Sequence, residues 1–384
     1  MKLSCRWIVC FFFVCAILDA QLSEGPWKTD LSKKSIPLSD LMRGGPPKDG
    51  IPAIDRPKFV DVRQAATWLV PKEPVLVVER DGEARAYPLQ ILIWHELVND
   101  EMEGTPILVS YCPLCNSAIV FDRRVDGIPH DFGVSGMLRH SDMVMYDRRT
   151  DSLWQQITGE AIVGAHTGKT LKILGSQTVS FDTFSKNFPE GRVLSRETGI
   201  QRPYGHTPYM GYEFGNRLMM PVPVTRSSHL RLLERIVTVS AGKTVRAYPF
   251  ALLRSRGVYE DKIKDARYVI FFEEGTVTPL DRREIRESRD IGSVGAFSPE
   301  LDGRRLGFRR KDGRIIDKET ASTWNVLGVA TEGPLAGKRL KPVDHGVYFA
   351  FAWLVFRPDT EIVGNSVGPP EEKLRPQNPL PRSP

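Results

Sequence analysis

The chain has 384 residues, enough for one or two hydrophobic cores, and its 53 basic and 47 acidic residues give a formal net charge of +6. Basic residues alternate with acidic ones, as in DRREIRESRD, which predicts a solvated surface and argues against nucleic-acid binding. Beyond residue 20, no stretch is long and apolar enough to predict a membrane span.

The first twenty residues have the pattern of a secretory signal peptide. Lys2 and Arg6 form a basic start, residues 7–18 an apolar core, and Ala20 is a small residue suited to cleavage. A membrane anchor would need about 18 to 20 apolar residues, and this core ends earlier, at Asp19. We therefore expect cleavage near Ala20 and a secreted or periplasmic mature protein without a transmembrane segment.

Composition divides the mature chain into four parts. Residues 21–50 are polar and rich in Pro and Gly, which predicts an extended N-terminal arm. Residues 366–384 are Pro-rich and nearly without apolar side chains, which predicts a disordered tail. Between them we expect a first lobe, residues 51–228, and a second, degenerate lobe, residues 229–365.

An internal repeat is the reason for predicting two lobes. VVERDGEARAYPLQIL resembles VTVSAGKTVRAYPFALL, so that Tyr87 corresponds to Tyr248. Two later blocks recur in the same order, one of them aligning Trp154 with Trp324. Such ordered similarity at a nearly constant spacing is typical of a duplicated unit.

Short strands bounded by Gly, Pro or Asp dominate both lobes. The predicted fold class is mainly β (α+β), with two tandem, internally duplicated β-rich lobes and a few short covering helices. The expected strands are residues 74–79, 106–111, 118–122, 142–147, 235–240 and 267–272, and the expected helices are Val60–Ala66, Leu89–Val98, Phe181–Phe188, Phe250–Arg256 and Phe349–Val355.

The mature chain keeps two cysteines, Cys112 and Cys115, in the stretch ILVSYCPLCNSAIVFD. Three interpretations fit this CxxC. A thioredoxin-like redox pair needs a helix after the first cysteine, whereas the following residues favour a strand. A metal knuckle at a hairpin tip suits Pro113, which restricts the turn, and Asn116, which tolerates a left-handed conformation. The third interpretation is a local disulfide or structural thiol pair.

A metal would need further ligands. His95 precedes the cysteine strand and has no histidine counterpart in the second lobe, although a histidine packed beside Trp94 is equally consistent with the pattern. Weaker candidates follow in a later segment. Asp147 and Glu96 are expected to orient the ligands from outside as hydrogen-bond acceptors. The weaker candidates are Met137, His140, Asp142 and Met143. Two thiolates with histidine suit zinc, and soft ligands slightly favour copper.

The other histidines lie in loop-like contexts. His206 belongs to RPYGHTPYMGYEFG, a segment between the lobes that predicts a packed linker or the wall of a pocket. The remaining four resemble ordinary surface residues, namely His130, His166, His229 and His345.

With these blocks, the chain resembles a bacterial family of exported proteins of unknown function, the domain-of-unknown-function family 3179. The resemblance is carried by DGEARAYPLQIL, WHELVND, YCPLCNSAIVFDRRVDG, FGVSGMLRHSDMVMYDRRTDSLWQQITGEAIVG, FPEGRVLS, RPYGHTPYMGY and GPLAGKRL, from about Asp49 to about Gly364. It implies export and a site that includes His95–Glu96 and Cys112–Cys115, but no particular reaction. The family's pattern commonly has Asn where this chain has His140.

The sequence therefore favours an exported protein that binds a transition metal, copper or zinc, through Cys112, Cys115 and His95, with metal-dependent oxidation as one use. The first alternative is a metal-free thiol–disulfide oxidoreductase in which Cys112 attacks and Cys115 resolves. The second is a non-catalytic ligand-binding or structural protein. No organic cofactor is expected, and the partner, an unknown small molecule or protein, cannot be read from the residues.

Overall fold

The computed structural model describes residues 27–215, 218, 220, 222–223 and 230–364. The predicted signal peptide, the Pro-rich tail and His229 lie outside these residues. Within them, no helix combines the length and the apolar character that crossing a membrane requires.

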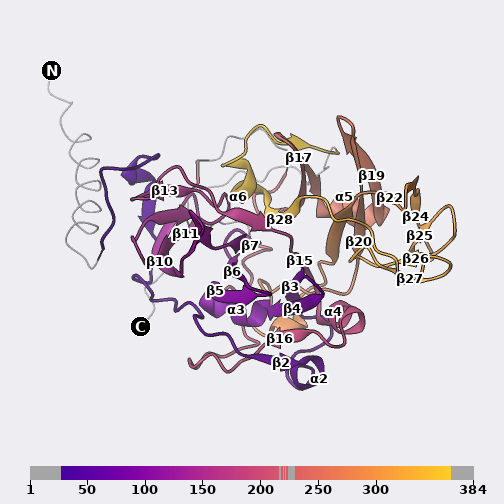
Figure 1. Cartoon of the computed structure of the whole chain (residues 1–384), viewed down its shortest axis with the longest axis horizontal. Coiled ribbons are helices and arrows are strands. Elements are labelled where there is room, and N and C mark those ends of the chain that lie inside the picture. The colour runs from indigo at the N-terminus through magenta and orange to yellow at the C-terminus, as the bar shows by residue number, and fades with distance from the viewer. Residues whose placement is uncertain (1–26, 216–217, 219, 221, 224–229, 365–384) are drawn as a thin grey trace.

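The predicted mainly β class with few short helices is confirmed (Figure 1). Residues 41–194 form three sheets and one two-stranded ribbon. The first sheet has the order β1(Leu41–Arg43)-β10(Phe132–Arg139)-β11(Asp142–Asp147)-β12(Leu153–Gln155)-β13(Ala161–Val163). The second is β14(Lys172–Leu174)-β7(Ser117–Asp122)-β6(Thr105–Cys112)-β5(Leu97–Met102), and the third is β15(Gln177–Ser180)-β3(Pro74–Arg80)-β4(Glu83–Pro88)-β16(Arg192–Leu194)-β2(Phe59–Asp61). The ribbon pairs β8(Arg124–Val125) with β9(Ile128–Pro129).

Residues 235–362 form the remaining sheets. They are β28(His345–Phe349)-β17(Arg235–Ala241)-β18(Thr244–Pro249)-β29(Glu361–Ile362), β19(Val258–Ile263)-β20(Ala266–Glu273)-β21(Ser293–Phe297), β24(Phe308–Lys311)-β25(Arg314–Asp317)-β26(Thr323–Trp324)-β27(Ala330–Glu332), and the pair β22(Glu300–Leu301)-β23(Arg304–Arg305).

The five predicted helices are all present, four of them at slightly different bounds. They are α2(Val62–Ala65), α3(Leu89–His95), α4(Phe181–Asn187), α5(Phe250–Arg256) and α6(Ala350–Leu354), beside two 3-10 turns, η1(Leu38–Asp40) and η2(Ile285–Glu287). The helix expected to reach Val98 ends at His95, because Glu96 has a φ of 59° and the chain then enters β5. A left-handed residue of this kind ends a helix.

Corresponding elements of the two halves have the same strand order and pairing sense. β3 and β4 are antiparallel and β4 is parallel to β16, while β17 and β18 are antiparallel and β18 is parallel to β29. The Ala-Tyr-Pro turns also match, because Tyr87 donates to Asp100 at 2.6 Å and Tyr248 donates to Asp261 at 2.7 Å. The duplication and the lobe boundaries remain predictions from the sequence.

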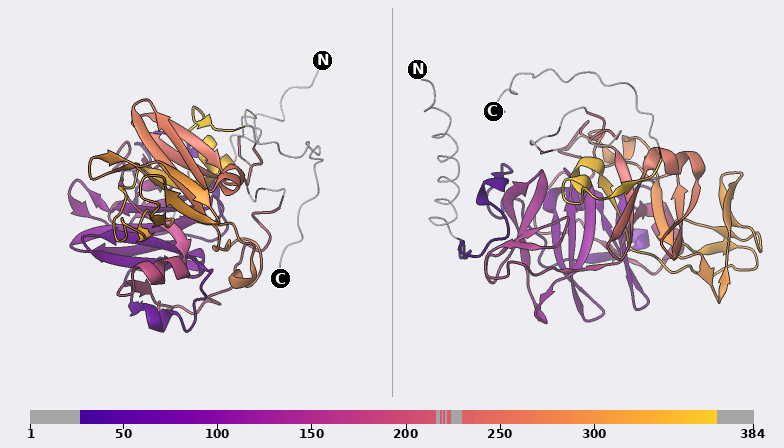
Figure 2. Two further views of the ribbon diagram at one scale, coloured as in Figure 1. Left: turned by 90° about the vertical axis from the view of Figure 1, so that its right-hand side faces the viewer. Right: turned by 90° about the horizontal axis from the view of Figure 1, so that it is seen from above.

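The main hydrophobic cluster joins distant parts of the chain. It contains Cys112 and Cys115 together with residues 348–352, from β28 and α6. In Figure 1, β28 and α6 (yellow) return to the middle of the molecule beside β7, and Figure 2 shows this return from two further directions. At the opposite end from the orange strands, β1 of the expected arm pairs antiparallel with β10. The C-terminal segment therefore covers the cysteine hairpin.

Candidate metal centre

The two cysteines lie at the tip of the hairpin formed by β6 and β7, as the sequence predicts. Cys112 is the last residue of β6, and the backbone N–H of Cys115 donates to the Cys112 carbonyl at 3.2 Å. Asn116 has a φ of 50°, the left-handed conformation expected of it. The segment after Cys115 is a strand, so the helix that a thioredoxin-like pair requires is absent from this described hairpin.

Both thiols are free and buried, with exposed fractions of 2% for Cys112 and 0% for Cys115. Burial raises the pKa of Cys112 and raises that of Cys115 well above its ordinary value. The Cys115 thiol donates to the Ser141 carbonyl at 3.4 Å. In the absence of a cation, the thiols are therefore protonated and weakly nucleophilic at neutral pH.

A second hairpin, between β10 and β11, brings a carboxylate to the thiols. Its two-residue turn consists of His140 and Ser141, both left-handed, with φ of 53° and 64°. Asp142 follows at the start of β11 and is fully buried. Its Oδ2 accepts hydrogen bonds from Gln155 Nε2 at 2.6 Å and from Ile157 N at 3.0 Å, whereas its buried Oδ1 has no partner.

Cys112, Cys115 and Asp142 form one cluster. One carboxylate oxygen and both sulfur atoms lie within 4.8 Å of one another. Burial raises the pKa of Asp142 to about 6, against the hydrogen bonds from Ile157 and Gln155 and the interactions with the Cys115 and Cys112 thiols. The donor set and the unpartnered oxygen suit a metal cation, which would deprotonate the thiols and satisfy Oδ1.

Glu96 adds a second buried carboxyl group beside this cluster. Burial and the nearby Asp142 carboxylate raise its pKa to about 8, so that it is mostly protonated at pH 7. Its backbone N–H donates to Leu92 and its carbonyl accepts from Tyr111, as Gly257 does with Leu253 and Phe272 in the other half. The position thus favours glycine, and a strained glutamate there is typical of a functional role.

The structure does not bring His95 into the cysteine cluster. Its Nδ1 lies 2.8 Å from the Pro52 carbonyl, and its Nε2 lies 2.6 Å from the Tyr204 hydroxyl. Both ring nitrogens therefore have protein partners. The neighbouring Trp94 donates to the His206 carbonyl at 3.1 Å, which packs the Tyr-rich segment against α3.

Of the four weaker candidates, only Asp142 belongs to the cluster. Met143 is buried in the same hydrophobic core as the cysteines, whereas Met137 packs in a separate core against Leu38 and Leu41. The His140 ring lies 5.6 Å from that of Phe356. Its backbone is left-handed, with a φ of 53°, a conformation that Asn tolerates well.

Tyrosine side chains from distant segments surround the cluster. Tyr209 and Tyr212 belong to the Tyr-rich segment that the sequence predicts as a packed linker or the wall of a pocket, whereas Tyr111 and Tyr348 were not singled out. Burial is the main cause that raises the pKa of Tyr111, Tyr209, Tyr212 and Tyr348. The Tyr212 hydroxyl donates to the Leu114 carbonyl at 3.0 Å. The Phe349 N–H donates to the Cys115 carbonyl at 2.9 Å. Only the tertiary structure places these residues there, since no spacing relates them to the CxxC.

The expectation of an ordinary surface histidine is wrong for His130. His130 is buried, with 4% exposed, because its ring packs against that of His166 at 5.2 Å and its Nδ1 lies 2.8 Å from the Ile128 carbonyl. His166 and His345 are half-buried, and His345 Nδ1 lies 2.8 Å from the Val343 carbonyl. His130 and His345 are each held by a neighbouring backbone carbonyl, which a loop-like sequence does not reveal.

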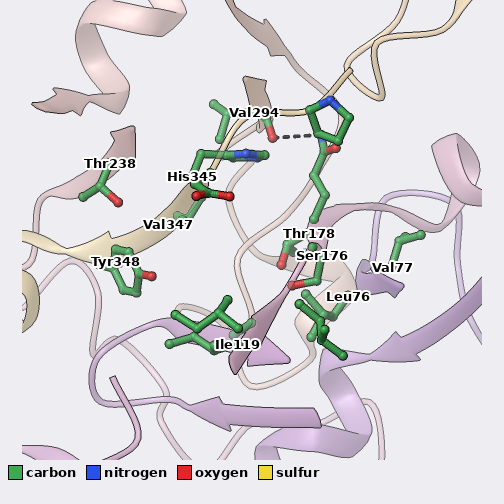
Figure 3. Close-up of a pocket in the computed structure, with 18 of the residues that line it drawn as sticks. Leu76, Val77, Ile119, Ser176, Thr178, Thr238, Val294, His345, Val347 and Tyr348 are labelled. Atoms are coloured by element: carbon green, nitrogen blue, oxygen red, sulfur yellow. Dashed lines mark hydrogen bonds between the residues drawn. The ribbon is translucent and has the colours of Figure 1, made fainter. Parts of the chain in front are cut away.

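A cavity of about 640 Å³ lies behind the cysteine hairpin, between elements of the two halves. Tyr111, Asn116 and Ile119 of the hairpin contribute to its wall. Figure 3 shows His345, Val347 and Tyr348 of β28 on one side and Ser176 and Thr178 on the other, with Ile119 below. Tyr348 lines the cavity, and burial, followed by the Asp142 carboxylate, raises its pKa.

The fold and the site define a class: a β-rich protein whose buried hairpin tip presents two free thiols beside a carboxylate. The chain belongs to the family described as protein of unknown function (DUF3179), whose model matches residues 48–360. No curated protein and no solved structure shows significant similarity to it.

Proposed function

We propose that the protein is an exported metal-binding protein that holds one transition-metal ion through Cys112, Cys115 and Asp142. The observation that carries the proposal is the buried Oδ1 of Asp142, which has no hydrogen-bond partner while two free thiols lie within 4.8 Å of its carboxylate. A buried polar atom without a partner costs about 1–3 kcal/mol. A bound cation would remove this cost.

The electrostatics support a cation. Without a cation the thiols keep their protons, whereas a bound cation would compensate the three negative charges of two thiolates and one carboxylate in this buried space. Glu96 is mostly neutral at pH 7 and adds little to this charge. In this proposal it is a positioning residue that can hold or release a proton beside the metal ligands.

Zinc suits the donor set better than copper. Two sulfurs and one oxygen are accepted zinc ligands, and three protein ligands leave one position open, as in catalytic zinc sites. The soft thioether of Met137, part of the case for copper, packs in another core. We therefore propose zinc as the resident ion, with copper as the competitor that the experiment includes.

The thiol–disulfide alternative has less support. Reactive cysteines have a depressed pKa and partial exposure, whereas burial raises the pKa of both thiols here. A metal-free redox pair would also leave Asp142 Oδ1 without a partner.

Metal content tests the proposal. Mature protein without a polyhistidine tag is isolated after export, and zinc and copper are measured by mass spectrometry before and after incubation with each ion. Asp142→Asn and Cys112→Ser/Cys115→Ser are compared with Glu73→Gln, a control at a buried carboxyl that accepts from Gln90 outside the cluster.

We expect the first two variants to bind one equivalent less than the wild type, and the control to retain the full amount. Asp142→Asn keeps the shape of the side chain, so a loss there reports on ligation and not on packing. Equal metal content in the wild type and the double cysteine variant would disprove the proposal and favour the redox pair.

The cavity favours a second candidate function, the binding of a small molecule. A volume of about 640 Å³ lies in the range of small-molecule sites, and its wall combines apolar residues with a few polar ones, including Thr178, Thr238 and His345. Ile119→Trp would fill it from the hairpin side. A library of small polar metabolites is screened for compounds that raise the melting temperature of the wild type. We expect these compounds to have no such effect on Ile119→Trp, whose metal content should be unchanged. The same increases in both proteins would contradict the proposed binding.

A further inference from the structure

A second group of potential metal ligands lies outside the cysteine cluster. One ring nitrogen of His130, one of His166 and a carboxylate oxygen of Asp147 lie within 4.8 Å of one another. His130 and Asp147 are buried, and His166 is half-buried. The sequence patterns predict surface positions for the histidines and, for Asp147, a role in orienting a ligand of the cysteine site, so they do not predict this site.

Three separate segments build the group. His130 follows the β8–β9 ribbon, Asp147 ends β11, and His166 lies in the turn after β13. The Asp147 carboxylate accepts from the Thr150 N–H at 2.8 Å and from Trp154 Nε1 at 3.1 Å. The carboxylate is thus held rigidly, as outer-shell donors hold a ligating carboxylate.

The ring nitrogens are available for ligation. His130 Nδ1 lies 2.8 Å from the Ile128 carbonyl, so Nδ1 carries the proton and the lone pair lies on Nε2. His166 Nε2 is buried and has no hydrogen-bond partner. Its Nδ1 lies 3.3 Å from Lys169 Nζ, and that ammonium also pairs with Asp126. Because the Lys169 ammonium can only donate, it favours the proton on His166 Nε2; metal binding there moves the proton to Nδ1 and leaves Lys169 to Asp126. A metal on Nε2 would then give this buried nitrogen its missing partner.

The other half of the molecule contains the same local structure around a carboxylate. Asp317 accepts from the Thr320 N–H at 2.6 Å and from Trp324 Nε1 at 3.0 Å, as Asp147 does from Thr150 and Trp154. The ring of Trp324 lies 5.7 Å from Phe308, and that of Trp154 lies 5.7 Å from Phe132. The two segments therefore provide an internal comparison.

Leucines occupy the histidine positions in that comparison. The N–H of His166 donates to Ser152 Oγ, and the N–H of Leu335 donates to Ser322 Oγ. The N–H of His130 donates to the carbonyl of Arg123, the residue before β8. In the same way, the N–H of Leu306 donates to the carbonyl of Pro299, the residue before β22. Because leucine serves both positions, the fold does not need histidine there.

We propose that His130, Asp147 and His166 form a second site for a divalent transition metal of the zinc class. Two imidazoles and one carboxylate are a common ligand set for such ions and leave coordination positions open for water or a small anion. The second half lacks two of the three ligands and would bind no ion at this position. The proposal stands whether or not the cysteine cluster binds metal.

Zinc stoichiometry of the full mature chain tests the proposal. The test variant is His130→Leu/His166→Leu, which introduces the residues that the other half uses and so is expected to fold. Cys112→Ser/Cys115→Ser removes the first site alone, and a variant combining all four changes removes both. The protein carries no polyhistidine tag, and its thermal unfolding is followed by circular dichroism.

We expect two equivalents in the wild type, one in each double variant and none in the combined variant. If the cysteine site binds no metal, the wild type holds one equivalent and the leucine variant none, which still supports the second site. Retention of the wild-type amount by the leucine variant would overturn the proposal. Should that variant unfold, His130→Leu and His166→Leu alone are each expected to weaken zinc at least about tenfold. Unchanged affinity in both would also overturn it.

Cobalt(II) substitution distinguishes the sites by spectroscopy. Thiolate ligands add sulfur-to-metal charge-transfer absorption, which imidazole and carboxylate ligands do not. In the double cysteine variant we expect cobalt to bind without that absorption. Adding the two leucine changes to this variant should abolish the cobalt binding. Cobalt bound equally by the combined variant would show surface binding only and contradict the proposed site.

Discussion

Asp142 and Asp147 are the first and last residues of the same strand, β11, and neighbouring residues of β12 hold both carboxylates. Gln155 Nε2 donates to Asp142 at 2.6 Å, and Trp154 Nε1 donates to Asp147 at 3.1 Å. Residues an odd number of positions apart on a strand point to opposite faces, and five positions span roughly 17 Å. One strand thus positions a ligand for each of the two proposed metal sites.

The two tryptophans offer a matched test of the second site. Trp154→Phe and Trp324→Phe each remove one indole hydrogen bond to a buried aspartate, so each should lower the free energy of unfolding by about 1–3 kcal/mol. Only Trp154→Phe should also weaken zinc at the second site, by about tenfold. Urea denaturation and zinc titration measure the two effects. An equal zinc affinity in both variants would argue that Trp154 has no role beyond packing.

The buried carboxyl of Glu96 predicts how stability depends on pH in the metal-free protein. Its pKa rises from 4.5 in the unfolded chain to about 8 in the folded one, so the folded state keeps a proton that the unfolded state loses. Stability therefore falls as pH rises from 4.5 to 8. Between pH 6 and 8 the loss attributable to Glu96 is about 2–3 kcal/mol.

Glu96→Gln should remove that part of the loss. Histidines and the other carboxyl groups titrate in both proteins, so the difference between wild type and variant isolates Glu96. Chemical denaturation at intervals between pH 6 and 8, in the presence of a chelator, measures it. Parallel stability curves for the two proteins would contradict the assignment.

His140→Asn tests whether the turn residue is a ligand. Asn adopts a φ of 53° with less strain than His does. The free energy of unfolding of the variant should therefore equal that of the wild type or exceed it by about a few tenths of a kcal/mol. Because His140 lies outside the thiol cluster, metal content should not change. A lost equivalent of metal would instead assign His140 to the site.

His95 separates the sequence-based ligand set from the one in the structure. His95→Gln and Tyr204→Phe both break the bond between His95 Nε2 and the Tyr204 hydroxyl, and each should cost about 1–3 kcal/mol of stability. Metal content should stay at the wild-type value in both. If His95→Gln alone loses metal, the original prediction of His95 as third ligand is correct.

Local signals in the sequence were sufficient for the six strands and five helices that it predicts, but many further short strands were not predicted. The strand around each cysteine, the left-handed Asn116 and all five helices follow from short-range propensity, because β-branched residues, Pro and Asn act within a few positions. The error at the end of α3 has a local cause as well. Glu96 adopts a conformation that glycine prefers, and a glutamate at that position conceals the helix end.

The composition of the candidate site depends on contacts across many residues. The sequence by itself determined Cys112 and Cys115 as its centre and placed Asp142 and Glu96 among the residues to consider. Only the tertiary structure decided that Asp142 joins the thiols while His95 bonds to Tyr204, and that His130, Asp147 and His166 meet. Strand pairing between distant segments sets these distances, and side-chain burial decides which polar atoms lack partners. Neither effect produces a fixed residue spacing that could be recognised in the sequence.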